Sequence, residues 1–245
     1  LKLRRSEDAF VDEVFADAPG HGAPLLCARF PRAYVDANRE AFELDPAMFE
    51  DTLPVYVNTS SPRIAAGLGT IARIVTDGED IYEAPLTFKE AERRIEALYR
   101  PYHGALIGLL EKTKARFGGC FLVDCHSMPS NAGNPGGKPG LNVDVVLGDC
   151  HGTACHGAIT DFAEKAFEDL GFRVARNKPY AGGFTTRHYG RPKDGVHVLQ
   201  VEINRALYMD EKRVKRTDGL AVLRQRIGRL IEALVAIDPA ILKAP

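Results

Sequence analysis

The sequence predicts an α/β fold, a mixed, largely parallel central sheet with flanking helices. Short apolar runs that are typical of buried strands alternate with amphipathic helical segments. Two of these runs end in polar residues, as expected where an open α/β sheet binds a ligand beyond its strand ends. The chain has 245 residues, of which 45% are apolar, so it can form a sizeable core. We expect a single domain over residues 1–245.

Few regular elements are predicted near the N-terminus. Apolar residues at helical spacing over 6–17 predict a short helix, with Ser6 as its N-cap. Short strands are expected at 25–29 and 71–75, on either side of an irregular stretch that contains several prolines.

The longest helix is predicted over residues 87–116. Thr87 and Glu90 have the spacing of a capping box, which indicates where the helix begins. Pro101 lacks a backbone N–H and should kink or divide the helix.

The C-terminal half alternates strands with helices. The predicted strands are 121–124, 143–147, 172–175 and 196–203, and the predicted helices are 156–170 and 217–236. Glycine-containing loops at 131–140 and 179–192 come after strands, where a substrate site would lie.

Composition narrows the class of protein. The net charge is -1 and no block of like charge is present, which argues against nucleic acid or an anionic membrane as the main partner. No apolar run approaches the roughly 20 residues of a transmembrane helix. The five cysteines are an odd number in a chain too long to need disulfides, so we expect reduced thiols and a cytoplasmic protein.

His126 is the first candidate for chemistry. It follows the predicted strand 121–124 in the segment Asp124-Cys-His-Ser-Met-Pro and precedes a loop, which favours a metal-ligand or catalytic role. The alternative is a buried histidine satisfied by hydrogen bonds.

Glu202 is the second candidate. It alternates with Val201 and Ile203 in an apolar strand, so its side chain points away from theirs. A carboxylate there is costly unless it is paired. It is either a general base or a structural ion-pair partner of Arg205 or Arg187.

Asp8, beside Glu7, is a weaker candidate, because acidic residues near the start of a predicted helix ordinarily complement its dipole. Arginines beside loops could bind an acidic substrate bidentately, with surface charge as the alternative. These arginines are Arg32, Arg39, Arg187 and Arg205.

Cysteine chemistry is less favoured. The spacing of Cys150-His151 and Cys155-His156 matches no common structural zinc pattern. Cys125 could be a nucleophile, but a small apolar side chain in a strand is the simpler interpretation.

Together these residues resemble the N-formylglutamate amidohydrolase family. The resemblance rests on stretches that cover nearly the whole chain in order. They are Ser6-Glu-Asp-Ala-Phe-Val-Asp, Phe30-Pro-Arg-Ala-Tyr-Val-Asp-Ala-Asn-Arg, Gly67-Leu-Gly-Thr-Ile-Ala-Arg, Tyr99-Arg-Pro-Tyr-His, Asp124-Cys-His-Ser-Met-Pro, Asp144-Val-Val-Leu-Gly-Asp, Asn177-Lys-Pro-Tyr-Ala-Gly-Gly, Thr186-Arg-His-Tyr-Gly and Leu199-Gln-Val-Glu-Ile-Asn-Arg-Ala-Leu-Tyr-Met.

The resemblance implies a fold like that of the zinc-dependent exopeptidases and aspartoacylases. It implies hydrolysis of N-formyl-L-glutamate to L-glutamate and formate, a late step of histidine degradation. The metal, expected to be zinc, would be held by His126, Asp8 and a histidine from a Pro-His segment that we expect before residue 1.

Roles for the other residues follow from the same resemblance. Glu202 matches the general base, which would take a proton from a metal-activated water and return it to the leaving amine. Asn38 and Arg39 match a pair near the substrate, with Arg39 stabilising the oxyanion. The remaining candidates for contacts to this small acidic N-acyl amino acid are Arg187, for its carboxylate, Arg32 and His188.

Three alternatives stay open. The same site could act on another N-acyl amino acid. The chain could instead be a metal-free binding protein for an acidic metabolite, or a thiol-dependent hydrolase that uses Cys125.

Overall fold

A computed structural model describes residues 3–75, 78–132 and 143–243. The predicted loop at 131–140 lies mostly outside the described residues. Contacts divide the chain into two compact units. Unit 1 is Leu1–Glu7 with Leu26–Gly108, and unit 2 is Asp8–Leu25 with Leu109–Pro245. None of the helices that the structure describes is long and apolar enough to cross a membrane.

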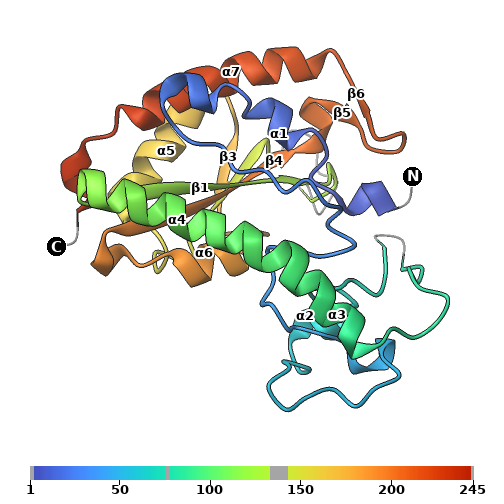
Figure 1. Ribbon diagram of the computed structural model, residues 1–245. Helices are drawn as coiled ribbons and strands as arrows, with labels where there is room; N and C mark the ends of the chain where they lie inside the picture. The colour runs from blue at the N-terminus through green and yellow to red at the C-terminus, as the bar shows by residue number, and fades with distance from the viewer. Residues whose placement is uncertain (1–2, 76–77, 133–142, 244–245) are drawn as a thin grey trace. The chain divides into compact units, whose positions relative to one another are not determined.

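Unit 2 contains a four-stranded sheet in the order β1-β4-β2-β3 (Figure 1). The strands are β1 (Cys120–Met128), β2 (Val145–Gly148), β3 (Val174–Arg176) and β4 (Val196–Asn204). β1 pairs with β4 and β2 with β3 in parallel, whereas β2 and β4 are antiparallel. The predicted mixed, largely parallel sheet is confirmed.

One face of this sheet forms the main apolar core. Leu199, Val201 and Ile203 of β4 are at most 1% exposed and belong to one cluster with residues of three helices. Burying each such side chain contributes roughly 1.5–3 kcal/mol. The helices are α1 (Val11–Val14), α5 (Gly157–Asp169) and α7 (Gly219–Val235).

The sequence pattern explains why α5 forms where it does. Its buried residues Ile159, Ala163 and Phe167 recur every four positions, so one face of the helix is apolar. The ring of His156 caps the first turn by accepting a hydrogen bond from a backbone N–H. Gly171, with φ of +81°, follows the last turn, directly after the end of the predicted helix 156–170.

α6 (Phe184–Tyr189) lies on the opposite side of the sheet from α1 and α7 (Figure 1). The sequence predicted only a loop at 179–192, and that prediction was wrong. Six residues are too short to show a clear apolar period. Tertiary contact stabilises this helix, because Thr185 and Thr186 are buried and the helix packs against β4.

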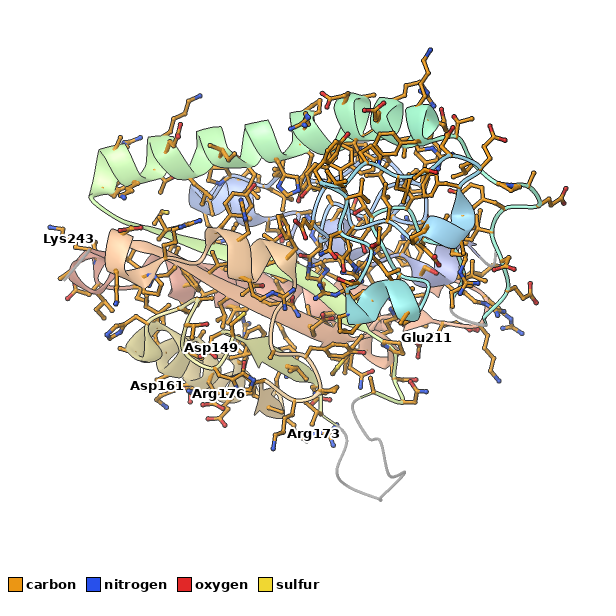
Figure 2. The ribbon with its side chains drawn as sticks, turned by 90° about the horizontal axis from the view of Figure 1, so that it is seen from below. Asp149, Asp161, Arg173, Arg176, Glu211 and Lys243 are labelled. Carbon is orange, nitrogen blue, oxygen red and sulfur yellow. The ribbon has the colours of Figure 1, made fainter. Side chains whose placement is uncertain are left out.

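Polar contacts attach the edge strand β3 to α5. Arg176 Nη1 lies 2.7 Å from an Asp161 oxygen, and Figure 2 shows both residues on one side of the sheet. Asp149, which follows β2, accepts a hydrogen bond from Thr160 Oγ1 at 3.1 Å and another from Asn177 Nδ2 at 2.9 Å. These contacts fix the loops around β2.

The predicted N-terminal helix is largely wrong. A 3₁₀ turn at Leu3–Ser6 is followed by Phe10 at φ of 66°, and only then by α1. Ser6 is therefore not an N-cap, and Asp8 does not lie in the first turn of a helix. A bend at Glu7 and a turn at 9–10 flank Asp8, which belongs to unit 2 and contacts His126 and Ser127 of β1.

Unit 1 has little sheet structure. The strands predicted at 25–29 and 71–75 are absent, apart from a single bridge between Ile74 and Asp80. The helices are α2 (Pro62–Ala65) and α3 (Phe88–Arg94), and α3 continues through a π-helical segment at Ile95–Tyr99 into α4 (Arg100–Phe117).

The cap and the interruption predicted for the long helix are both present. The Thr87 hydroxyl accepts a hydrogen bond from the Glu90 backbone N–H at 3.2 Å, which confirms the Thr87 half of the predicted capping box, whereas the Glu90 carboxylate accepts from Arg93 and Arg94. The π-helical segment ends two residues before Pro101, whose missing N–H removes one helical hydrogen bond.

The remaining elements are short. They are 3₁₀ turns at Ala18–His21, Pro46–Met48, Pro192–Asp194, Arg205–Leu207 and Pro239–Leu242, and the hairpin of β5 (Met209–Asp210) and β6 (Lys215–Arg216).

Candidate active site

Four polar residues lie on the face of the sheet opposite the apolar core. In the β1–β4 pairing, Asp124 is level with Gln200 and His126 is level with Glu202. Residues that are level in a parallel pair point to the same face, and alternate residues share a face. His126 is part of β1, which continues to Met128, and does not lie beyond the strand as predicted.

His126 is held between two carboxylates. Its Nδ1 lies 3.0 Å from Asp8 Oδ2, and its Nε2 lies 3.0 Å from Asp124 Oδ1. Burial by itself would lower the pKa of His126, but attraction to Asp124 and Asp8 outweighs burial and raises that pKa well above its usual range. Neutral histidine has one donor nitrogen, so full use of both contacts requires the protonated ring.

Asp8 is oriented by Ser127 and Arg205. Asp8 Oδ1 accepts hydrogen bonds from the Ser127 backbone N–H at 2.8 Å and from Ser127 Oγ at 3.0 Å. Arg205 Nε donates to the same hydroxyl at 3.0 Å. The predicted carboxylate-binding role of Arg205 is untested, but this buried arginine already supports a carboxylate of the protein itself. Sequence reasoning missed Ser127.

Glu202 is buried, and a neutral amide contacts it. Its side chain accepts a hydrogen bond from Gln200 Nε2 at 3.0 Å. Gln200 Oε1 in turn accepts from the backbone N–H of Gly183 at 2.7 Å. Gln200 was not among the sequence candidates, although its position two residues before Glu202 already indicated a shared face.

α6 contributes residues on the same face. Thr186 Oγ1 donates to Asp124 Oδ2 at 3.3 Å, so this helix contacts one of the carboxylates that hold His126. Arg187 is exposed, and its Nη1 donates to the Gly182 carbonyl at 3.1 Å. The ring of His188 stacks on Phe184 with centroids 4.7 Å apart.

The other predicted substrate residues lie in unit 1, around the buried Asp36. This carboxylate accepts hydrogen bonds from Arg32 Nε and from the Asn38 backbone N–H, each at 2.9 Å, and lies 3.5 Å from Arg39 Nη1. Burial by itself would raise the pKa of Asp36, but Arg32 and Arg39 outweigh that effect and lower it. Arg39 also donates to the carbonyls of Leu68 and Asn38.

Asp8 and His126 fit two ligands of one metal ion. The 3.0 Å between Asp8 Oδ2 and His126 Nδ1 is close to the ~3.3 Å between two ligands of a tetrahedral zinc. The carboxylate of Asp124 at Nε2 is the partner that a metal-bound histidine usually has. Over residues 3–75, 78–132 and 143–243, no group of three or more His, Cys, Asp or Glu side chains is arranged to hold a metal.

Two of the cysteines, Cys125 and Cys155, belong to or pack against the apolar core. Cys125 packs against the apolar core on the other face of β1, which gives a thiol mechanism no support. Burial raises the pKa of Cys155 to about 12, so this thiol is protonated at neutral pH.

Comparison with known proteins identifies relatives of the chain. The family model for N-formylglutamate amidohydrolase matches residues 1–209. Two curated relatives are named N-formylglutamate deformylase. The one from Pseudomonas putida is 27% identical and the one from Pseudomonas aeruginosa 29%; each alignment covers 94% of this chain and 81% of the relative.

Solved structures share the fold. The N-formylglutamate amidohydrolase from Ralstonia eutropha JMP134 aligns with a TM-score of 0.88 at 38% identity, covering 94% of this chain and 83% of that one. A gene product of Agrobacterium tumefaciens aligns at 0.58 with 20% identity, which is a likeness of fold alone. The match over most of the chain, on a fold and motifs that agree, shows that this chain belongs to the N-formylglutamate amidohydrolase family.

Proposed function

We propose that this protein hydrolyses N-formyl-L-glutamate to L-glutamate and formate. The observation that carries the proposal is the placement of His126 level with Glu202 on adjacent parallel strands, next to Asp8. Relatives that carry the names N-formylglutamate deformylase and N-formylglutamate amidohydrolase supply the substrate.

Asp8 and His126 are the residues of this chain that would hold a divalent metal, most simply zinc. When bound, zinc lowers the pKa of a water and polarises a carbonyl. Asp124 would keep the His126 ring oriented through Nε2, and Ser127 would keep Asp8 turned toward His126. The family resemblance implies a histidine as the third ligand.

Glu202 is the proposed general base. It takes a proton from the water whose oxygen bonds to the formyl carbon, and it gives a proton to the nitrogen as the C–N bond breaks. Formate and the free amine of glutamate result. The Gln200 amide donates to this buried carboxylate, which lies on the face of the sheet opposite the apolar core.

The carboxylates of the glutamate portion of the substrate need cationic side chains as partners. Arg187 is the proposed partner of a substrate carboxylate, because it is exposed in the last turn of α6, the helix whose Thr186 contacts Asp124. Asn38 and Arg39 match the family's pair near the substrate, and Arg39 is proposed as the oxyanion stabiliser. Arg32 and His188 are proposed as further substrate contacts.

The test measures metal content and formate release together on the purified native protein. The expected result is turnover of N-formyl-L-glutamate that chelation abolishes and that zinc or cobalt restores. Turnover that survives complete chelation would remove the metal from the proposal. Turnover of other N-acyl amino acids alone would replace the substrate, and ligand binding without turnover would favour a binding protein.

A further inference from the structure

The amide of Gln200 connects a loop backbone to the proposed base. A backbone N–H can only donate, so the Gln200 atom that faces Gly183 at 2.7 Å is the amide oxygen. The amide nitrogen is then turned toward Glu202, which accepts from it at 3.0 Å. The orientation of this side chain is therefore set by the main chain of Gly183.

Burial makes this connection rigid. Gln200 is 3% exposed and Glu202 8%, so loss of either hydrogen bond would leave a buried polar group poorly satisfied. Both side chains leave the same strand two residues apart, and β4 has a neighbour on each side. Neither residue can move far without disturbing the centre of the sheet.

The loop that contains Gly183 packs directly against the sheet. Gly148 of β2 is level with Gln200, and a Cβ at Gly148 would lie 2.8 Å from the backbone carbon of Ala181. Only glycine lets the loop backbone come this close to the strand. Gly182 adopts φ of +137°, which other residues rarely adopt, and the next residue, Gly183, donates its N–H to Gln200.

We propose that Gln200 is a positioning residue for Glu202. It fixes the plane of the base and supplies one hydrogen bond to its ionised form, and it does so from an orientation that the Gly182-Gly183 loop imposes. This inference rests on the proposed function of Glu202.

Two substitutions of Gln200 test its hydrogen bonds to Gly183 and to Glu202. Gln200→Met keeps the approximate size and removes both hydrogen bonds. Gln200→Glu keeps an acceptor for Gly183 and sets a second carboxylate against Glu202, which disfavours ionisation of the pair. Gln225→Met on the exposed side of α7 is the matched control.

The expected result is a kcat at least 10-fold lower in Gln200→Met, with KM changed less than 3-fold. In Gln200→Glu, the acid limb of the kcat/KM profile should move up by about one pH unit or more. Gln225→Met should match the wild type in both. An unmoved acid limb in Gln200→Glu, or a kcat loss in Gln200→Met that merely follows a loss of Tm, would overturn the proposal.

A second readout keeps this proposal distinct from the proposed function. In protein with 13C-labelled glutamate carboxyls, the Glu202 signal, assigned with Glu202→Gln, should titrate at higher pH in Gln200→Glu than in the wild type. Absence of formate release by the wild type would contradict the proposed function. The Glu202 titration would then be the remaining test of whether Gln200 positions Glu202. An unchanged Glu202 titration would sink the positioning role, whether or not the enzyme turns over.

Discussion

At the scale of single residues, the alternation of side chains along β1 decides which of them reach the candidate site. Cys125 and His126 are neighbours in sequence, yet one packs in the apolar core and the other contacts Asp8 and Asp124 on the opposite face. The backbone thus separates a thiol from an imidazole without any loop or insertion.

The role of Glu202 is tested by Glu202→Gln. This change keeps the shape and removes the ability to take a proton, so kcat should fall by about 10²-fold or more while the fold is kept. Metal content and circular dichroism should match the wild type. Glu232→Gln on the surface of α7 is the control, and near-normal turnover by Glu202→Gln would exclude the base role.

The support of Asp8 is tested by Ser127→Ala. The hydroxyl bond to Asp8 is lost while the backbone bond at 2.8 Å stays, so the carboxylate is loosened and not released. Metal affinity should fall about 10-fold, in the range seen when groups behind a ligand are removed. Ser130→Ala, at an exposed position, should leave affinity unchanged. Equal affinities in the two variants would argue against Asp8 as a ligand.

At the scale of elements, close approach of loops to the sheet matters more than helix length. The 181–183 backbone lies on β2 because residue 148 has no side chain, and α6 follows at once. This six-residue helix forms because the 181–183 backbone fixes where it begins and its packing against β4 stabilises it.

This packing predicts opposite results for two glycines. Gly148→Ala would place a methyl group 2.8 Å from backbone atoms that cannot rotate away, so the loop must shift. The hydrogen bond from the Gly183 N–H to Gln200 should then be lost. We expect kcat/KM to fall at least 10-fold and Tm to drop. Gly157→Ala at the first turn of α5 meets nothing within 4 Å and should be neutral or slightly stabilising. Thermal melts and kinetics of both variants check this, and normal kinetics in Gly148→Ala would contradict it.

At the scale of the whole molecule, the two units have different kinds of order. Unit 2 is organised by a sheet with one apolar and one polar face, whereas unit 1 is held by short helices, turns and buried groups such as Asp36. The expectation of a single domain remains a prediction.

Global stability should depend on pH through Asp144. This residue precedes β2 and accepts hydrogen bonds from the backbone N–H and the guanidinium of Arg173, which precedes β3 and lies near the lower edge in Figure 2. Burial by itself would raise the pKa of Asp144, but the hydrogen bonds from Arg173 outweigh it and lower that pKa.

A depressed folded-state pKa contributes stability that is fully present above the unfolded value, about 3.9, and is lost as pH falls through the folded value. Asp144→Asn should therefore lower the free energy of unfolding at pH 6, and the difference from wild type should shrink below about pH 4. Denaturant titrations at several pH values check this. A difference that is independent of pH would assign the effect to shape alone.

The sequence by itself determined the fold class and the family, and it singled out His126 and Glu202 as candidate site residues. Apolar strand runs and strand-end motifs are local signals, and the alternation around Glu202 specified its face. The same signals located α5, α7 and the Thr87 cap, because apolar periodicity and capping residues act over only a few positions.

Only the tertiary structure decided which groups meet. Asp8 lies 118 positions from His126 in sequence, and the expected N-terminal helix would have turned it elsewhere. Ser127, Gln200 and the Gly183 backbone carry no local signature, because their roles depend on partners brought by strand register and by close backbone approach. Strand register and loop seating are set by packing across the whole sheet, and a linear pattern of residue types does not contain that information.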